Sequence, residues 1–212
     1  MRLVTSARLR AAVLADLVAD DEIAALAEIE GVTSQRLLAQ DSSAYGIGRD
    51  DLVHGVPFAS FINASFAYFK PGEPNRFNFD RGAWYCALDV ETCLSEVSWH
   101  MAEFLGRTGR YQAVVEYAEL YASLAGEFYD MRGMEDHAAL HPEPAVGYPE
   151  GNRIALAART RGLNGIIYPS VREPGGTCIA AILAHAVQSV AQGAMFRLVW
   201  SGTSIPVVES LG

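Results

Sequence analysis

The residue types best suited to chemistry gather between Arg76 and His100. Glu96 and His100 stand four residues apart in a segment with helical periodicity, so their side chains share one face of the predicted helix. Arg76 and Arg81 precede a predicted strand, and a loop guanidinium can bind a phosphate through two parallel hydrogen bonds. Each residue also has a plainer explanation, because exposed Glu–His pairs and surface arginines are common. Tyr85, in the strand itself, is by default a core aromatic with a hydrogen-bonded hydroxyl.

A second cluster, residues 165–176, runs from a short apolar strand into Pro169, Ser170 and a glycine-rich loop. Binding residues are often found where a strand passes into a loop. Ser170 lacks the G-x-S-x-G sequence of a nucleophile elbow, which favours a serine that hydrogen-bonds a ligand or caps a turn over a nucleophile. Arg172 can bind a phosphate or a nearby carboxylate such as that of Glu173.

Other patterns predict neither a metal site nor a nucleotide fingerprint. His137 and His141 are four residues apart, but the sequence between them lacks the glutamate of an H-E-x-x-H motif. Gly46 and Gly48 lack the third glycine and the flanking strand and helix of a dinucleotide fingerprint. The three cysteines are an odd number with no C-x-x-C pair, which argues against a disulfide framework or a zinc site. We therefore expect no bound metal and reduced, buried thiols.

The elements that must position these residues follow one another without a regular strand–helix–strand rhythm. Apolar residues at helical spacing predict helices within residues 1–40, at 91–105 with Asp89 as the cap, and at 151–161. Short apolar or alternating runs predict strands at residues 65–69, 83–88, 111–118, 165–168, 178–183 and 195–200. Residues 119–150 hold several prolines and are predicted to be irregular. This order favours an α+β fold over a doubly wound parallel sheet.

The overall composition narrows the class of protein. The chain has 212 residues, of which 50% are hydrophobic, so it can form one domain with a core, and wholesale disorder is excluded. Its formal net charge of −9 argues against direct nucleic-acid binding and against a polybasic protein of the membrane surface. This net charge does not exclude an anionic small-molecule substrate, because a binding site needs only one or two local cations. The sequence shows no signal peptide and no apolar run of about 18 residues, so we expect a cytoplasmic protein.

Together, the two clusters resemble those of the RES-domain family, named for an Arg, a Glu and a Ser in that order. The first family block reads approximately R-F-N, Gly, Tyr-x-Ala and a helix with E-x-x-x-H, and the second reads G-I-x-Y-P-S-x-R. The chain carries these blocks as Arg76-Phe77-Asn78, Gly82, Tyr85-Cys86-Ala87, Glu96 with His100, and Gly165-Ile166-Ile167-Tyr168-Pro169-Ser170-Val171-Arg172. The similarity spans residues 55–205, with Glu96 and Ser170 74 positions apart, and residues 1–45 resemble the N-terminal extension of longer members.

The resemblance implies a compact α+β domain with a split mixed sheet and a cleft for NAD, similar to the fold of ADP-ribosyltransferases. It implies a catalytic, NAD-binding domain over residues 46–212, preceded by a helical N-terminal extension over residues 1–45. It further implies a toxin that degrades NAD by cleaving the nicotinamide–ribose bond, through phosphorolysis or hydrolysis. NAD would be the substrate and inorganic phosphate a co-substrate, with no resident cofactor. A helix-turn-helix antitoxin would be the protein partner, and a homodimer is left open.

The resemblance also assigns roles to single residues. Arg76 would bind the pyrophosphate, Tyr85 would frame the nicotinamide, and Glu96 would stabilise the cationic ribose. Ser170 would hold a ribose or phosphate oxygen. Further substrate contacts are expected from three residues, Arg81, His100 and Arg172.

Two other functions stay open from the sequence. The same cleft could pass the ribose to a protein or nucleic acid, which is the activity of an ADP-ribosyltransferase. Alternatively, the chain could be a non-catalytic module that only binds the antitoxin. The intact set of Arg76, Tyr85, Glu96 and Ser170 counts against this last function.

Overall fold

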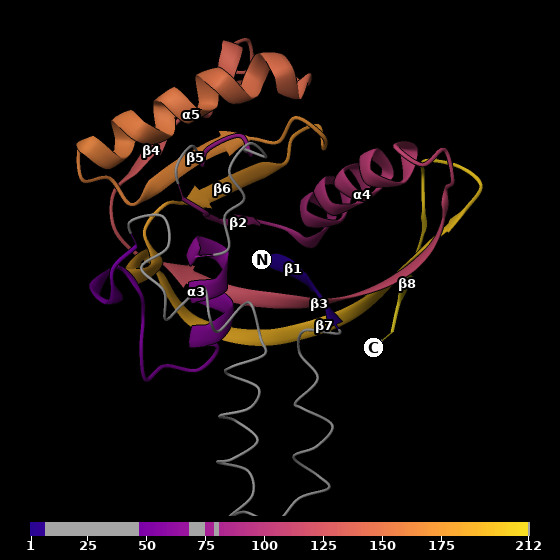
Figure 1. Cartoon of the computed structure of the whole chain (residues 1–212), viewed down its shortest axis with the longest axis horizontal. Coiled ribbons are helices and arrows are strands. Elements are labelled where there is room, and N and C mark those ends of the chain that lie inside the picture. Colours follow the sequence, from indigo (N-terminus) through magenta and orange to yellow (C-terminus); the bar gives the residue numbers. More distant parts are fainter. Residues whose placement is uncertain (7–46, 68–74, 79–80, 212) are drawn as a thin grey trace, which may run out of the picture.

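Among the described residues, two separate four-stranded sheets form the frame of the protein (Figure 1). The computed structural model describes residues 1–6, 47–67, 75–78 and 81–211. The helices predicted between residues 7 and 40 lie outside these ranges, as does the predicted domain boundary at residues 45 and 46.

The first sheet is wholly antiparallel and contains the longest strands. Its order is β1 (Arg2–Thr5), β3 (Gln112–Leu124), β7 (Val187–Ser201) and β8 (Val207–Ser210). β3 and β7 pair along most of their length, with register shifts between Ala118 and Leu120 and between Tyr121 and Ser123. Such irregularities bend a strand pair and increase its twist, and both strands curve strongly in Figure 1.

The second sheet is shorter and mixed. Its order is β2 (Trp84–Ala87), β6 (Thr177–Ala181), β5 (Gly165–Pro169) and β4 (Phe128–Asp130). β4 pairs with β5 in parallel, whereas the other neighbours are antiparallel. Two sheets, one of them mixed, combined with helices confirm the predicted α+β fold with a split sheet.

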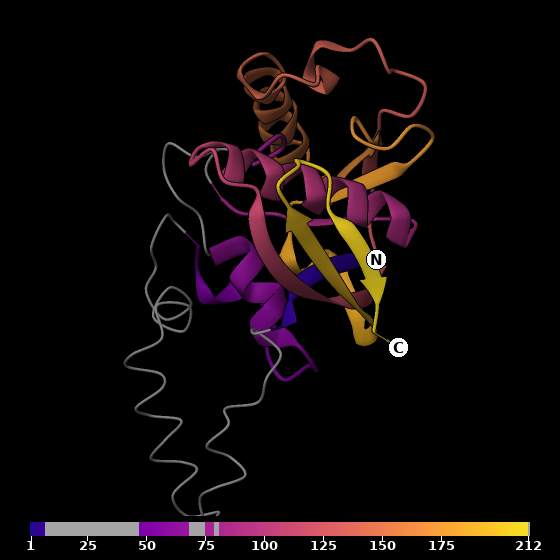
Figure 2. The ribbon, with the colours of Figure 1, turned by 90° about the vertical axis from the view of Figure 1, so that its right-hand side faces the viewer.

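In the part of the chain that the structure describes, three α-helices pack around the sheets: α3 (Ala59–Ala67), α4 (Val90–Gly106) and α5 (Pro144–Thr160). The short 3-10 helices η3 (Arg49–Asp51), η4 (Ala138–Leu140) and η5 (Ala184–Ala186) accompany them. In both Figure 1 and Figure 2, α5 lies on the side of the second sheet away from β3 and β7. α4 contacts both β1 and β2, and so it joins the two sheets.

The start of α4 shows how the sequence positions this helix. Asp89 has extended backbone angles and its carboxylate accepts a hydrogen bond from the backbone N–H of Thr92 at 2.6 Å, as predicted for a cap. Glu91 lies in the first turn, where a negative charge is favourable beside the positive end of the helix. The helix therefore starts at a defined residue, and the positions of Glu96 and His100 along it are fixed.

The structure corrects three of the predicted elements. Arg2–Thr5, predicted to belong to the helical extension, form β1, because Leu3 and Val4 are buried and the strand pairs with β3. Residues 65–67, predicted to open a strand, end α3, where Ile62 and Phe66 bury the same helix face. α5 starts about two turns before residue 151, because Pro144 fits the first turn of a helix.

The core lies between the sheets and beneath the helices. Its fully buried large side chains include Phe77 before β2, Trp84 and Ile166 in the second sheet, and Leu198 and Trp200 in the first sheet. Within the described part of the chain, no helix has the length and apolar character needed to cross a membrane.

We predict that Gly82→Ala destabilises the protein by about 3 kcal/mol. The backbone N–H of Gly82 donates to Phe66 O at 3.0 Å, and a Cβ on Gly82 would lie 1.9 Å from Ser65 O, which is backbone. Urea unfolding at equilibrium measures the change. Gly48→Ala is the control, because its Cβ would lie 3.7 Å from Asp51 Oδ2, an ordinary contact. Equal unfolding midpoints for the two variants would contradict the prediction.

Candidate active site

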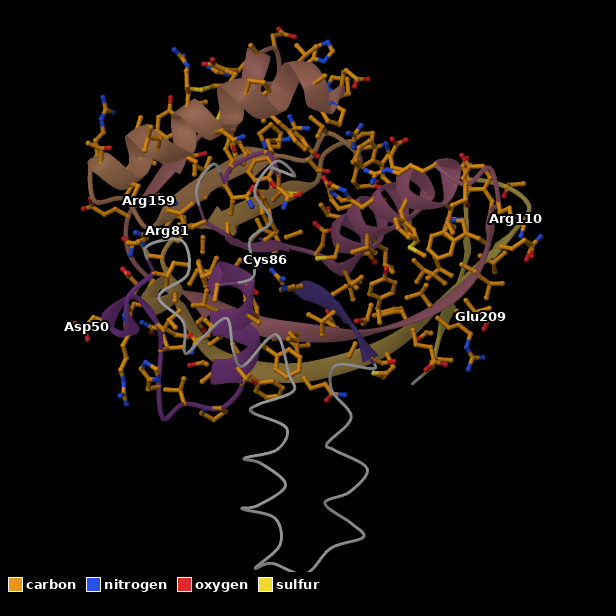
Figure 3. All side chains as sticks on the ribbon, viewed as in Figure 1. Asp50, Arg81, Cys86, Arg110, Arg159 and Glu209 are labelled. Carbon is orange, nitrogen blue, oxygen red and sulfur yellow. The ribbon has the colours of Figure 1, made fainter. Side chains whose placement is uncertain are left out.

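A cavity of about 240 Å³ opens where α4, α5 and the two sheets come together. Its walls come from β1, β2, α4, α5, β5, β6, the segment before β2 and the loop between β5 and β6. The lining residues are Arg2, Leu3, Asn75, Arg76, Tyr85, Cys86, Ala87, Cys93, Glu96, Val97, His100, Tyr148, Tyr168, Arg172 and Cys178. Figure 3 shows Cys86, a lining residue, near the middle of the molecule between the sheets. Five of the seven predicted site residues are therefore in the walls of one cavity, namely Arg76, Tyr85, Glu96, His100 and Arg172.

Ser170, a sixth predicted residue, contacts Glu96 directly. Its Oγ donates a hydrogen bond to Glu96 Oε1 at 2.8 Å. The same Oγ accepts the backbone N–H groups of Arg172 at 3.1 Å and of Glu173 at 3.0 Å. Because the hydroxyl has one proton and that proton is directed to the carboxylate, Ser170 here holds Glu96 in place. The fold thus brings together two residues 74 positions apart.

The carboxylate of Glu96 has a second neighbour in β6. Cys178 Sγ lies 3.6 Å from Glu96 Oε1, within range of a weak S–H donor. Burial raises the pKa of the Cys178 thiol well above its usual value, and the nearby charge of Glu96 acts in the same direction. The thiol therefore keeps its proton, and Oε1 is held from two sides.

The loop that carries Ser170 is fastened to α4. Ser95 Oγ donates to the Glu173 carboxylate, and the Ser170 backbone N–H donates to Gly176 O at 2.8 Å. A Cβ on Gly176 would lie 2.4 Å from Thr92 Oγ1, so only glycine allows the loop to lie this close to the helix. The close packing sets the distance between the serine and the glutamate.

Arg76 is buried and is held by backbone oxygens. Its Nη1 donates to Ala139 O and, at 3.0 Å, to His141 O, and its side chain is only 6% exposed. A guanidinium has five N–H donors, so those on Nε and Nη2 are left to bind a ligand in the cavity. The centre of the guanidinium lies 5.2 Å from the centroid of the Tyr148 ring.

Arg172 spans two elements at the cavity. Its Nη2 donates to Pro142 O at 2.6 Å, and the centre of its guanidinium lies 3.5 Å from the centroid of the Trp99 ring on α4. This stacking is a cation–π contact, which holds the charge without neutralising it. His100 follows Trp99 and lines the cavity one turn after Glu96.

Tyr85 is fixed through its hydroxyl. The hydroxyl oxygen accepts the backbone N–H of Phe77 at 2.9 Å and lies 3.4 Å from Asn78 Oδ1. Burial raises the pKa of the phenol well above its usual value, so the group stays neutral. The ring can frame a ligand but cannot supply a charge.

Arg81 is the predicted site residue that the structure does not bring to the cavity. Its Nη1 lies 3.4 Å from Asp51 Oδ1, in an ion pair with η3. The backbone N–H of the next residue, Gly82, donates to Phe66 O in α3, and Arg81 is not among the lining residues. Figure 3 shows Arg81 at the edge of the molecule, on the same side as Asp50.

The two histidines considered for a metal site have local partners. His137 Nδ1 accepts the backbone N–H of Ala139, and His141 Nδ1 accepts that of Glu143, both at 3.1 Å. Among the residues that the structure describes, no group of three or more His, Cys, Asp or Glu side chains could hold a metal ion.

Sequence reasoning missed two prominent lining residues, Arg2 and Tyr148. Arg2 lies in β1, where its Nη1 donates to Tyr85 O at 3.2 Å and its guanidinium covers the Trp84 ring. The apolar pair Leu3-Val4 weakly indicates a strand, but the helical periodicity that follows it led to the prediction of a helical extension. Tyr148 lies in the region that was predicted to be irregular. The sequence signal for its helix was Pro144, because proline is favourable in the first turn of a helix.

Comparison with known proteins adds two findings. The family model of the RES domain matches residues 52–201. An uncharacterized protein, y4oC of Sinorhizobium fredii, is 28% identical over 213 residues, which cover 98% of this chain and 85% of that protein.

The thiols lead to a second prediction. Cys86, Cys93 and Cys178 are all buried, and burial raises the pKa of each thiol, that of Cys93 to about 12. An unfolded thiol has a pKa of about 8.5. The free energy of unfolding that these neutral thiols contribute is therefore complete below that pH and is lost as the pH rises above it.

At pH 8 we expect iodoacetamide to leave the native protein unmodified, because the three thiols are buried and protonated. In urea we expect it to modify all three thiols, as measured by mass spectrometry.

A variant with an exposed thiol calibrates this experiment. Val114 is 64% exposed on β3, so Val114→Cys should react at this single site in the native protein. Modification of Cys178 as fast as that of the introduced thiol would contradict the prediction.

Proposed function

The chain belongs to the RES-domain family, and from this membership and the geometry of the cavity we propose that it is an enzyme that cleaves the nicotinamide–ribose bond of NAD. The family supports a toxin-like, NAD-related function at a coarse level. The specific reaction is our proposal. The observation that carries it is Glu96, a carboxylate held in one orientation by Ser170 and Cys178 in a cavity lined by arginines and tyrosines.

The chemistry of this bond needs little acid–base assistance. Nicotinamide leaves as a neutral molecule, because the electron pair of the broken C1′–N bond cancels the positive charge on its ring nitrogen. Positive charge develops on the ribose, as in other glycosyl cleavages with an oxocarbenium-like transition state. A fixed carboxylate is the group that stabilises such a charge, and a preorganised one does so without having to reorient. Glu96 fits this role.

The cationic side chains of the cavity suit the pyrophosphate of the substrate. The cavity walls carry three arginines and one glutamate, although the whole chain has a net charge of −9. NAD has a doubly charged pyrophosphate, and arginine binds phosphate oxygens through parallel N–H groups. Arg76 offers Nε and Nη2 for this contact, and Arg172 adds a second cation. We infer that the pyrophosphate lies between these two residues.

The cavity also matches a part of NAD in size and character. At about 240 Å³ it is somewhat smaller than a typical small-molecule pocket of about 300 Å³ or more, so we place only one end of the dinucleotide inside it. The neutral rings of Tyr85 and Tyr168 suit the flat nicotinamide. The reaction ends when an oxygen of phosphate or water bonds to C1′, and in the case of water a proton passes to the solvent.

Glu96→Gln tests the central role. We expect kcat/KM for NAD to fall by a factor of about 100 to 1,000, because the amide cannot stabilise the cationic ribose as the carboxylate does. Nicotinamide release measured by chromatography gives the rate. Glu91→Gln on the same helix is the control, because Glu91 is exposed in the first turn and is not a lining residue. Full turnover by Glu96→Gln would overturn the assignment.

The product identifies the acceptor. With inorganic phosphate present, phosphorolysis yields ADP-ribose-1″-phosphate, whereas hydrolysis yields free ADP-ribose whatever the phosphate concentration. We expect one of these products to account for all the NAD consumed, as measured by mass spectrometry. Label from NAD that appears on a macromolecule would instead identify an ADP-ribosyltransferase.

A further inference from the structure

Tyr148 on α5 has a contact that suggests a specific task. Its ring lies against the guanidinium of Arg76, with 5.2 Å between the guanidinium carbon and the ring centroid, and the residue lines the cavity. We infer that Tyr148 is a positioning residue, which fixes Arg76 so that its remaining N–H donors meet a diphosphate. This inference rests on the proposed function, in which Arg76 binds the pyrophosphate of NAD.

The guanidinium is restrained from two directions. On one side, Nη1 is tied to the backbone oxygens of Ala139 and His141. On the other, the Tyr148 ring covers a face of the guanidinium, and a cation–π contact is stronger where water is excluded. The ring stays neutral, because burial raises the pKa of its hydroxyl. The restraints leave the edge that carries Nε and Nη2 as the binding edge.

The helix itself is shaped for this contact. A Cβ on Gly147 would lie 2.6 Å from His141 O and 2.7 Å from Arg76 Nη1, and a Cβ on Gly151 would lie 2.1 Å from Arg76 O. Both glycines therefore allow α5 to approach Arg76 more closely than any other residue would. Gly147 and Gly151 flank Tyr148 on α5, so the helix backbone and the aromatic ring act on the same side chain.

Two substitutions separate the ring from the hydroxyl. Tyr148→Leu removes the ring, and we expect KM for NAD to rise about tenfold while kcat stays within about twofold. Tyr148→Phe keeps the ring, and we expect its KM to stay within about twofold of the wild-type value. An unchanged KM in Tyr148→Leu would overturn the inference, and so would an equal rise in both variants, because the hydroxyl would then be the group that matters.

A second variant moves the guanidinium without touching the ring. We expect Gly147→Ala to raise KM and to leave kcat largely unchanged, because the new Cβ would lie 2.7 Å from Nη1 and 2.6 Å from His141 O, the backbone oxygen to which Nη1 donates. Val146→Ala is the matched control at the preceding position of α5, where the residue is 51% exposed and does not line the cavity. Urea unfolding midpoints identify any variant that fails to fold. If Tyr148→Leu does not fold, Gly147→Ala decides the matter, and an unchanged KM in it overturns the inference.

Binding of ADP separates this inference from the proposed function. ADP carries a diphosphate but has no nicotinamide–ribose bond, so calorimetry of ADP binding does not depend on catalysis. Weaker ADP binding by Tyr148→Leu and Gly147→Ala supports the inference even if the wild type does not cleave NAD, which would overturn only the proposed reaction. Cleavage of NAD by the wild type together with unchanged ADP binding by both variants overturns only the inference.

Discussion

The hydrogen bond from Ser170 Oγ to Glu96 Oε1 is the contact on which the site depends. It joins the middle of α4 to the end of β5, and each partner is fixed independently by local structure. Ser170 accepts two backbone N–H groups of its own turn, and the Asp89 cap defines where α4 begins. The carboxylate therefore has its orientation before a substrate arrives. A charge preorganised in this way is more effective than one that must first turn toward the reacting atoms.

Two arginines of the cavity are held differently from three arginines at the surface. Arg76 and Arg172 donate to backbone oxygens and contact aromatic rings, so their positive charges are positioned but not cancelled. In contrast, Arg132, Arg153 and Arg197 each pair with a carboxylate within 2.8 Å. Cations that keep their charge can attract an anion, and this reconciles an acidic protein with an anionic substrate.

Local signals in the sequence were sufficient for the elements that carry Tyr85, Glu96 and Ser170. An apolar run, a capping aspartate and a glycine-rich turn each determine structure within a few residues. Contacts between distant segments could not be predicted in this way. β1 is a strand because it pairs with β3, and Arg81 faces away because Asp51 lies beside it. The residues around β1 and around Arg81 contain no local pattern from which β3 or Asp51 could be predicted as their partners.

Glycines set distances in the site that the charged and aromatic residues alone do not determine. Gly147, Gly151 and Gly176 each stand where a Cβ would lie 2.7 Å or less from a neighbouring atom. Gly147 and Gly151 let α5 pack closely against Arg76, and Gly176 lets the loop that carries Ser170 pack closely against α4. The geometry around Arg76 and Glu96 thus depends on positions that carry no chemistry of their own. In a sequence such glycines resemble turn or flexibility signals, and their role becomes apparent only when the segments they bring together are known.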